Sequence, residues 1–260
     1  MQREFEGKCV FIMGGTTGIG RAAAELLAER GARVALFGSD VSADQADANL
    51  DALPEDIPVF IGDGSQSAEV RAAVERTVQQ FGGLDILINS AAVHPYGTAL
   101  ETPDHVWDRV MGVNVKSAYL TAHFGLPHLI ARGGGAIVNV ASNQGSANTA
   151  GLSAYATSKG ALLAFTRTLA IDFGMHNIRA NSVSPGPIDT PLLRIAAEKF
   201  GKGHDRQAVY GEWSESVPIR RIGMPGEIAE VIAFLASDRA SYVTGADYAA
   251  DGGLLAKLGF

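Results

Sequence analysis

The chain has 260 residues, of which 47% are hydrophobic, and its 21 basic and 28 acidic residues give a formal net charge of −7. This composition can build the core of one sizeable domain or two small ones, and it shows no lysine and arginine cluster of the kind that binds nucleic acid. A single cysteine, a charged N-terminal segment without a signal-like apolar core, and the absence of an apolar run near about 18 residues lead us to expect a cytoplasmic protein without an intrachain disulfide or a membrane span.

Short apolar runs rich in β-branched residues recur along the chain and predict strands. They occupy residues 8–14, 32–38, 57–63, 84–90, 135–142, 178–186 and 241–253. Helical patterns separate them: apolar residues follow i, i+3, i+4 spacing in 66–82, and 225–237 carries one apolar face. Thr102 is the predicted N-cap of a helix that runs from Pro103 to about Ala131.

This regular alternation predicts a doubly wound α/β fold with a parallel sheet. No linker or repeat divides residues 1–260, so a single domain is expected. In such folds, ligands bind beyond the carboxyl ends of the strands.

A glycine-rich loop, "GGTTGIG", follows the first predicted strand. Gly14, Gly18 and Gly20 can serve a tight turn, a close backbone approach to a pyrophosphate and close helix–strand packing. The helix starting near Ile19 would present free N–H groups to phosphates. A glycine-rich turn without a ligand is the alternative, and the position between a strand and an amphipathic helix favours the phosphate loop.

Several further motifs follow in order: "IGDGS" around Asp63, "NSAA" at 89–92, "VNVKS" around Asn114, Ser142 thirteen residues before Tyr155 of "YATSK", and "SPGPIDTP" at 184–191. Together with the glycine loop they resemble the short-chain dehydrogenase/reductase family in its compact single-domain branch. The resemblance covers almost the whole chain. Met13, Ser90 and Ala92 depart from the family's pattern, and we expect a local adjustment around Ala92 rather than a loss of cofactor binding.

The resemblance implies an NAD(P)-dependent enzyme that transfers a hydride between a nicotinamide cofactor and an alcohol or carbonyl. The cofactor-binding residues that it implies are Gly14, Thr16, Thr17, Gly18, Ile19, Gly20, Ser39, Asp40, Asp63, Gly64, Asn89, Ala91, Tyr155, Lys159, Pro185, Gly186, Ile188 and Thr190. Family members usually assemble as homotetramers. Trp107, Val110, Phe165 and Leu169 are candidate interface positions, and burial in the core is the alternative for each.

Tyr155 and Lys159 are four residues apart and therefore face the same side of a helix. A nearby ammonium favours tyrosinate, so we expect a lowered tyrosine pKa. The resemblance implies a catalytic set of Asn114, Ser142, Tyr155 and Lys159. Tyr155 would exchange the proton, Ser142 would donate to the substrate oxygen, Lys159 would also hold the ribose, and Asn114 would anchor a water beside Lys159. A surface Tyr–Lys pair and a structural Asn114 are the alternatives.

The end of the second strand, "ALFGSD", bears on the choice of dinucleotide. An acid there selects NAD, whereas a basic residue suits the 2′-phosphate of NADP. By the resemblance this position falls on Gly38, followed by Ser39, and Asp40 lies 20 residues after Gly20. The glycine loop contains no lysine or arginine, so NAD is favoured over NADP.

Three segments are expected to form the substrate pocket: 92–98, 143–153 and an insertion at 187–215. The candidate substrate-binding residues are His94, Asn143, Gln144, Asn148, Arg194 and Trp213. Their amides favour a polar, hydroxylated small molecule such as a sugar or polyol, and the bases of the insertion would suit an anionic one. The insertion is interpreted as a lid, with a solvated helical excursion as the alternative.

Other functions remain open from the sequence. A ketoacyl or other carbonyl reductase is the alternative within the same chemistry, and a non-catalytic cofactor-binding regulator is the alternative from another class. A sugar-nucleotide epimerase or dehydratase would need a C-terminal substrate domain that the 260 residues do not provide. The six histidines show no paired spacing with acids or the cysteine, so no metal site is expected.

Overall fold

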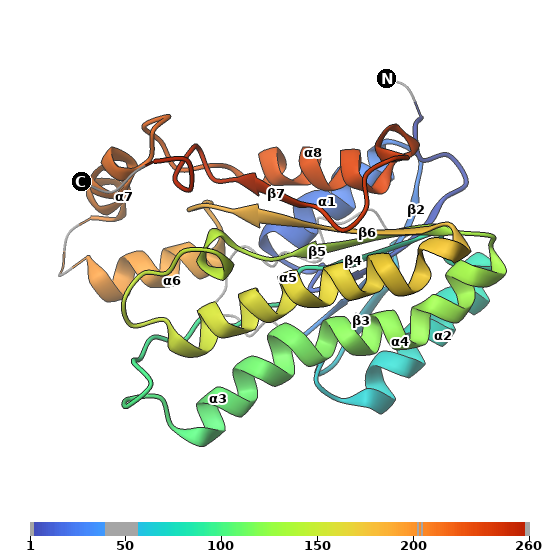
Figure 1. Ribbon diagram of the computed structural model, residues 1–260, viewed down its shortest axis with the longest axis horizontal. Coiled ribbons are helices and arrows are strands. Elements are labelled where there is room, and N and C mark those ends of the chain that lie inside the picture. The colour runs from blue at the N-terminus through green and yellow to red at the C-terminus, as the bar shows by residue number, and fades with distance from the viewer. Residues whose placement is uncertain (1–2, 40–56, 202, 204, 258–260) are drawn as a thin grey trace.

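The computed structural model describes residues 3–39, 57–201, 203 and 205–257. Its centre is a seven-stranded sheet in the order β3-β2-β1-β4-β5-β6-β7 (Figure 1), and every neighbouring pair runs parallel. The strands are β1 (Cys9–Met13), β2 (Arg33–Gly38), β3 (Val59–Ile61), β4 (Ile86–Asn89), β5 (Gly135–Val140), β6 (Ile178–Pro185) and β7 (Asp247–Ala250). Each lies within its predicted run, which confirms the doubly wound α/β fold in a single domain.

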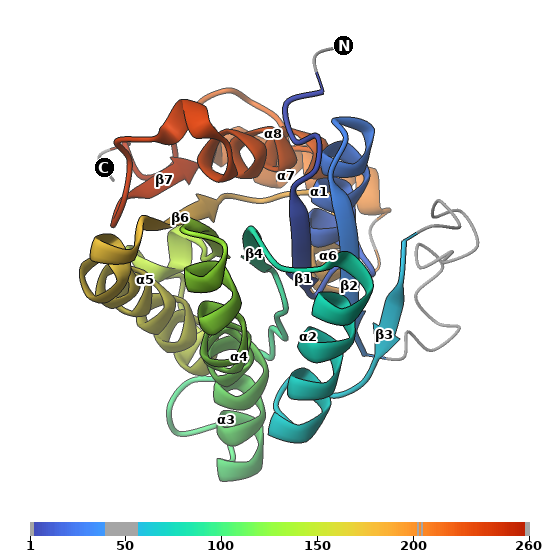
Figure 2. The same ribbon diagram turned by 90° about the vertical axis from the view of Figure 1, so that its right-hand side faces the viewer.

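Helices cover both faces of the sheet (Figure 2). They are α1 (Gly18–Glu29), α2 (Ser67–Phe81), α3 (Asp104–Val110), α4 (Ser117–Ala131), α5 (Ser153–Phe173), α6 (Pro191–Phe200), α7 (Arg206–Ser216) and α8 (Pro225–Ala236). Residues of α1 and α8 share one apolar cluster with the sheet, and residues of α2, α4 and α5 share another.

The alternation of side chains along β1 explains these two cores. Val10 and Ile12 belong to the cluster under α1 and α8, whereas Phe11 and Met13 belong to the opposite one. Successive side chains of a strand point to opposite faces, so a strand covered on both sides must be apolar throughout.

The amino ends of two strands and the end of a helix are tied together by Asp85, which is 8% exposed. Its Oδ2 accepts a hydrogen bond from the Cys9 backbone N–H at 2.8 Å, and the Arg132 guanidinium donates to both carboxylate oxygens at 3.1 Å. This charge pair holds the start of β1, the approach to β4 and the end of α4 in one place, at the edge of the sheet opposite the strands' carboxyl ends.

Two details of the long helical stretch differ from the sequence prediction. Thr102 is not the N-cap: the helix begins at Asp104 after Pro103, and the Thr102 hydroxyl donates to the carbonyl of Thr98 at 2.7 Å. The stretch is also not one α-helix, because residues Met111–Lys116 between α3 and α4 form a π-helix.

The candidate interface positions separate into buried and exposed ones. Val110 and Leu169 are buried at 0% and 3% exposure, which selects for these two the alternative of burial in the core. Phe165 packs partly buried against the core, and Trp107 is 38% exposed. No helix in the described part of the chain is long and apolar enough to cross a membrane.

Candidate active site

A cavity of about 1460 Å³ lies at the carboxyl ends of the strands. Its walls come from the segments that follow β1, β2, β4, β5 and β6, joined by parts of α5, α6 and α7. Single small-molecule sites commonly measure about 300–1000 Å³, so this one has room for a dinucleotide together with a second small molecule.

The glycine loop forms the floor of one end of the cavity. Gly14 has φ +77°, and a β-carbon there would lie 2.4 Å from the backbone nitrogen of Ala91. A β-carbon on Gly20 would lie 2.1 Å from the Gly14 carbonyl oxygen, so the loop packs directly against the start of α1. Thr17, the N-cap of α1, makes no side-chain capping bond, and the first turn contains no acid. The loop therefore offers free N–H groups to an anion, as a pyrophosphate would require.

The segment after β4, in which Ser90 and Ala92 depart from the family's pattern, still packs against the glycine loop. Ser90 N–H donates to the Met13 carbonyl at 2.8 Å, and both Ser90 and Ala92 line the cavity. Ala92 is not among the described residues with positive φ, so its methyl group requires no strained backbone.

Ser142, Tyr155 and Lys159 converge on the same cavity. Ser142 follows β5, while Tyr155 and Lys159 lie one turn apart on α5. All three are buried, and a hydrogen bond joins the Ser142 and Tyr155 side chains. The Lys159 ammonium donates to the Val140 carbonyl at 2.8 Å and lies 5.6 Å from the centre of the Tyr155 ring.

The pKa values of this pair move apart. Burial raises the pKa of Tyr155 to about 12 against the opposing effect of the Ser142 hydrogen bond, and burial lowers the pKa of Lys159 to about 7. The expected lowering of the tyrosine pKa is therefore wrong for the chain alone. Both groups are desolvated, and the Lys159 amine is directed at a carbonyl rather than at the phenol. A positive charge brought beside the phenol would lower its pKa again.

Asn114 does not line the cavity, and it contacts the segments that carry the cavity residues instead. It is buried in the π-helix, where its Oδ1 accepts from the Val93 N–H at 2.8 Å and its Nδ2 donates to the Val93 carbonyl and the Ser158 hydroxyl at 3.0 Å. Ser158 in turn donates to the Tyr155 carbonyl at 2.6 Å. Asn114 thus fixes the segment after β4 relative to the turn of α5 that carries Tyr155 and Lys159.

Most of the predicted site residues line the cavity. They are Gly14, Thr16, Thr17, Gly18, Ile19, Ser39, Asp63, Gly64, Ala91, His94, Ser142, Asn143, Gln144, Tyr155, Lys159, Pro185, Gly186, Ile188, Thr190 and Trp213. Asp40 lies outside the described residues.

Three predicted side chains point elsewhere. Asn89 is buried in the sheet, where its Nδ2 donates to the Oδ1 of Asn139 at 2.7 Å. Asn148 is exposed and absent from the cavity wall. Arg194 donates to Asp189 Oδ1 at 2.9 Å, beside the Tyr210 hydroxyl on the same oxygen, and is also absent from the wall. Spacing in the sequence does not show which way a side chain on a loop or helix turns. Here the hydrogen-bond partners of Asn89 and Arg194 set the directions of their side chains.

At the end of the cavity that holds Tyr155, two aromatic rings that were not among the predicted site residues, Tyr96 and Phe200, join the predicted His94. The His94 ring centre lies 4.1 Å from that of Tyr155 and 4.6 Å from that of Tyr96, in edge contacts. The Phe200 ring lies 4.4 Å from Tyr96. The "HPY" segment carried a partial signal, but Phe200 comes from the end of α6, and only the tertiary fold brings it here.

At the other end, Thr16 and Asp63 shape the wall. A β-carbon on Gly38 would lie 2.4 Å from Thr16 Oγ1. Asp63 accepts a hydrogen bond from the Ser65 N–H at 2.8 Å, which is the main cause of the lowered pKa of its carboxyl group. Arg109 also lines the cavity, and its charge adds to that lowering.

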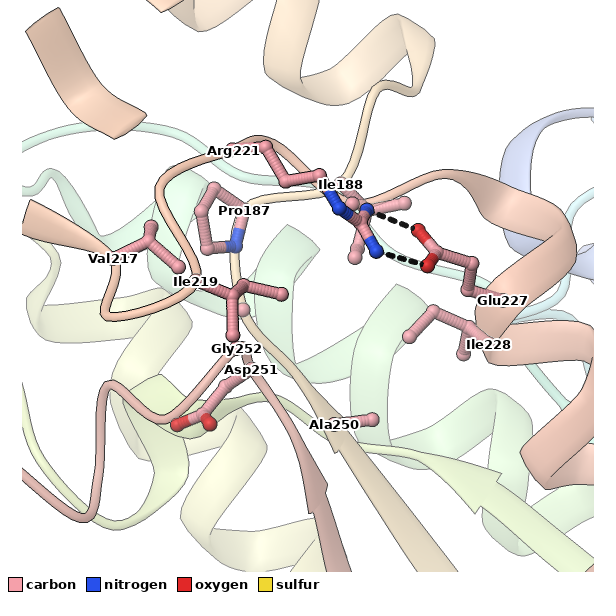
Figure 3. A pocket seen from close by; sticks show the side chains of 12 residues that line it. Pro187, Ile188, Val217, Ile219, Arg221, Glu227, Ile228, Ala250, Asp251 and Gly252 are labelled. Atoms are coloured by element: carbon pink, nitrogen blue, oxygen red, sulfur yellow. Dashed lines mark hydrogen bonds and ion pairs between the residues drawn. The ribbon is translucent and has the colours of Figure 1, made fainter. Parts of the chain in front are cut away.

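The segment after β6 separates the main cavity from a smaller one of about 190 Å³ (Figure 3). Gly186, Pro187 and Ile188 line both. The Gly223 N–H donates to the Pro187 carbonyl at 2.9 Å, and the paired side chains of Arg221 and Glu227 lie at the rim (Figure 3). The segment that precedes α8 therefore holds residues 186–188, which form part of the main cavity wall, in place.

Known proteins resemble this chain over nearly its full length. Residues 14–255 match the family model described as Enoyl-(Acyl carrier protein) reductase. A 3-oxoacyl-[acyl-carrier-protein] reductase of Thermotoga maritima is 34% identical, with 96% of this chain and 98% of the relative covered. A cyclohexanol dehydrogenase of an Acinetobacter strain is 34% identical, covering 99% and 98%. The aldohexose dehydrogenase structure from Thermoplasma acidophilum has a TM-score of 0.92 at 31% identity, covering 100% of this chain and 98% of that one.

Proposed function

Because this chain belongs to the short-chain dehydrogenase/reductase family, we propose that it is an oxidoreductase acting on a secondary alcohol or its carbonyl. The convergence of Ser142, Tyr155 and Lys159 on one cavity, next to the glycine loop, is the observation that carries this proposal. A cofactor-binding regulator would need the loop but not the catalytic side chains.

In this proposal, Tyr155 exchanges the proton of the substrate hydroxyl, and Ser142 donates a hydrogen bond to the same oxygen. Bound nicotinamide would supply the hydride chemistry, and in its oxidised form the positive charge that favours tyrosinate. Lys159 holds the ribose and, when protonated, adds to that charge. Asn114 keeps this turn of α5 in place through Val93 and Ser158.

We propose NAD as the preferred cofactor, with NADP as the alternative. The N–H groups of residues 16–20 would hold the pyrophosphate, since those of Gly14 and Gly15 already donate to the Phe37 carbonyl, and Asp63 and Gly64 would lie near the adenine. Among described residues of the cavity wall, the lysines and arginines are Arg109 and Lys159. Neither follows β2 or belongs to the glycine loop, which leaves a 2′-phosphate without a described cation at that position.

The substrate is proposed to be a neutral, hydroxylated small molecule such as a sugar or polyol. Asn143, Gln144 and Thr149 supply polar groups to the wall, and Trp213 and Leu254 supply apolar ones. Arg194, which suggested an anionic substrate, is paired with Asp189. A ketoacyl or other carbonyl substrate is the alternative, supported by the similarity to the Thermotoga reductase.

We further propose that α6 and α7 cover the substrate and that the protein is a homotetramer. Phe200 of α6 and Trp213 of α7 line the cavity, and Ala197, Val209 and Tyr210 give these two helices an apolar cluster of their own. Size-exclusion chromatography with light scattering tests the oligomeric state, and a monomer would contradict it.

The function is tested with the purified protein, a panel of secondary alcohols and aldoses, and both oxidised cofactors, by following the absorbance of reduced nicotinamide. Carbonyl compounds with the reduced cofactors test the reverse direction. We expect turnover with hydroxylated substrates and a higher kcat/KM with NAD. Cofactor binding without turnover of any substrate in either direction would favour the regulator instead.

A further inference from the structure

We propose that His94 recognises a second oxygen of the substrate, on the carbon next to the one that reacts, so that this enzyme prefers vicinal diols and the corresponding α-hydroxy ketones over simple alcohols. The inference rests on the proposed function, because it assumes that the reacting oxygen sits at Tyr155 and Ser142. It adds the residue that selects the substrate and the arrangement of substrate oxygens that the residue requires.

The two ring nitrogens of His94 are polar groups without partners in the described chain. The side chain is half-buried and lines the main cavity, yet no described residue makes a hydrogen bond with either nitrogen. Neither is among the fully enclosed unpartnered atoms, so both remain accessible. Water can satisfy both nitrogens in the free protein, and a ligand that displaces this water must replace its hydrogen bonds. The partner expected here is a ligand in the cavity.

The position of the ring fixes which substrate atom it can meet. His94 lies in edge contact with Tyr155, at 4.1 Å between ring centres. Tyr96 also makes an edge contact with His94, and Phe200 packs on Tyr96 in turn, so neighbouring rings hold the imidazole in place. A substrate held at the Tyr155 hydroxyl therefore presents the atoms next to its reacting carbon to His94.

The chemistry of a neutral imidazole matches a hydroxyl group. Burial and the nearby Lys159 charge lower the pKa of His94 to about 4, so at neutral pH one nitrogen donates and the other accepts. A hydroxyl also does both. Oxygens on adjacent carbons lie about one hydrogen-bond length apart, so one can be held by Tyr155 and Ser142 while the other reaches His94.

The reaction balances without any further reactant. One carbinol carbon of the diol loses its hydrogen as a hydride to the oxidised nicotinamide, and the hydroxyl proton of that carbinol passes to Tyr155. The two electrons of the C–H bond leave with the hydride, and the carbon becomes a ketone. The neighbouring hydroxyl keeps its proton and its bond to His94, so the product is an α-hydroxy ketone.

The test compares four probes: cyclohexanol, cis- and trans-1,2-cyclohexanediol, and 1,3-cyclohexanediol. Each is assayed for kcat and KM with wild type, His94→Phe, His94→Gln and the control His105→Phe. His105 is exposed on α3 and does not line the cavity. Cofactor affinity and thermal unfolding of each variant report folding separately from substrate choice.

We expect the wild type to favour at least one 1,2-diol isomer over cyclohexanol by about tenfold or more in kcat/KM, the worth of one well-placed hydrogen bond. His94→Phe should bring that ratio close to one, mainly through KM. His94→Gln, which retains a donor and an acceptor, should restore part of it, and His105→Phe should keep the wild-type ratio.

Three outcomes would overturn the assignment: no preference for 1,2-diols in the wild type, an unchanged ratio in His94→Phe, or an equal preference for the 1,3-diol. If His94 had only a structural role, His94→Phe would lower kcat/KM for all four probes together. His94→Gln would then not restore the preference for 1,2-diols. Failure of the wild type to oxidise any alcohol or aldose with either cofactor would instead contradict the proposed function itself.

Discussion

The side chain of Thr16 fills the space that a side chain at Gly38 would occupy: a β-carbon there would lie 2.4 Å from Thr16 Oγ1. The position at the end of β2 that often carries a cofactor-selecting side chain is therefore a glycine for a steric reason. Its lack of an acid says little about which dinucleotide binds, and the selection must rest on neighbouring groups.

Gly38→Asp should consequently fail as a route to tighter NAD binding. The new side chain would overlap Thr16, and overpacking of this kind costs about 1–3 kcal/mol of stability. Combining it with Thr16→Gly should recover the stability and raise the ratio of NADP to NAD dissociation constants. Thermal unfolding and fluorescence titration with both cofactors measure the two effects. Wild-type stability in the single Gly38→Asp variant would refute the packing argument.

Tyr155→Phe removes the phenolic oxygen and keeps the ring that contacts His94. We expect kcat to fall by about 10²–10⁴-fold, the usual contribution of a positioned acid–base group, while cofactor affinity stays close to wild type. Steady-state kinetics and cofactor titration measure both. Tyr242→Phe is the matched control, because Tyr242 is fully exposed and outside the cavity wall. A fall of less than tenfold for Tyr155→Phe would assign the proton transfer to another group.

The buried amine of Lys159 should make stability depend on pH. Its folded pKa of about 7 lies below the unfolded value of about 10.4, so between these values the unfolded chain binds more protons. Stability then rises with pH across this window, by at most about 1.4 kcal/mol per pH unit, and the penalty is fully present below about pH 7.

Lys159→Met should remove most of this slope and raise stability at neutral pH while abolishing activity. Urea unfolding of both proteins from about pH 7 to about pH 9.5, below the tyrosine range, provides the comparison. Parallel profiles for the two proteins would show that the amine is not desolvated as the structure indicates.

Asp85→Asn should weaken the amino-terminal edge of the sheet. It breaks the charge pair with Arg132 and can turn an amide donor toward the Cys9 N–H. Because Arg132 is partly exposed, we expect a loss of about 2 kcal/mol in the free energy of unfolding rather than the full cost of a buried pair. The exposed Arg3–Glu6 pair offers the control: Glu6→Gln should change stability by less than about 1 kcal/mol. Equal effects of the two substitutions would contradict a special role for Asp85.

The strand positions and the glycine loop followed from the sequence because local patterns encode them. Buried parallel strands are apolar on both faces, and the close approaches of Gly14 and Gly20 leave no room for a β-carbon. The convergence of Tyr155 and Lys159 likewise follows from helical spacing.

Features that depend on partners distant in the sequence were not predictable in this way. The π-helix contains Asn114, whose partner Val93 is 21 residues away. Arg194 looked like a substrate ligand, but it pairs with Asp189, whose Oδ1 also accepts from the Tyr210 hydroxyl of α7, 21 residues beyond Asp189. Burial raises the pKa of Tyr155. The sequence did not indicate this rise, because the spacing of charged residues does not show how deeply a side chain is buried.

The amide pair inside the sheet also bears on how the strands find each other. Asn89 of β4 and Asn139 of β5 are aligned in the ladder, and the Asn139 amide continues to the Thr166 hydroxyl on α5 at 2.8 Å. A slip of one residue would set Asn89 beside Val138 or Val140 and break the bond between the two amides, which leaves Asn89 Nδ2 and Asn139 Oδ1 unpaired at about 1–3 kcal/mol for each group. Because the other residues of β4 and β5 are apolar or glycine, this pair gives the two strands a means of telling the native alignment from its neighbours as the sheet assembles.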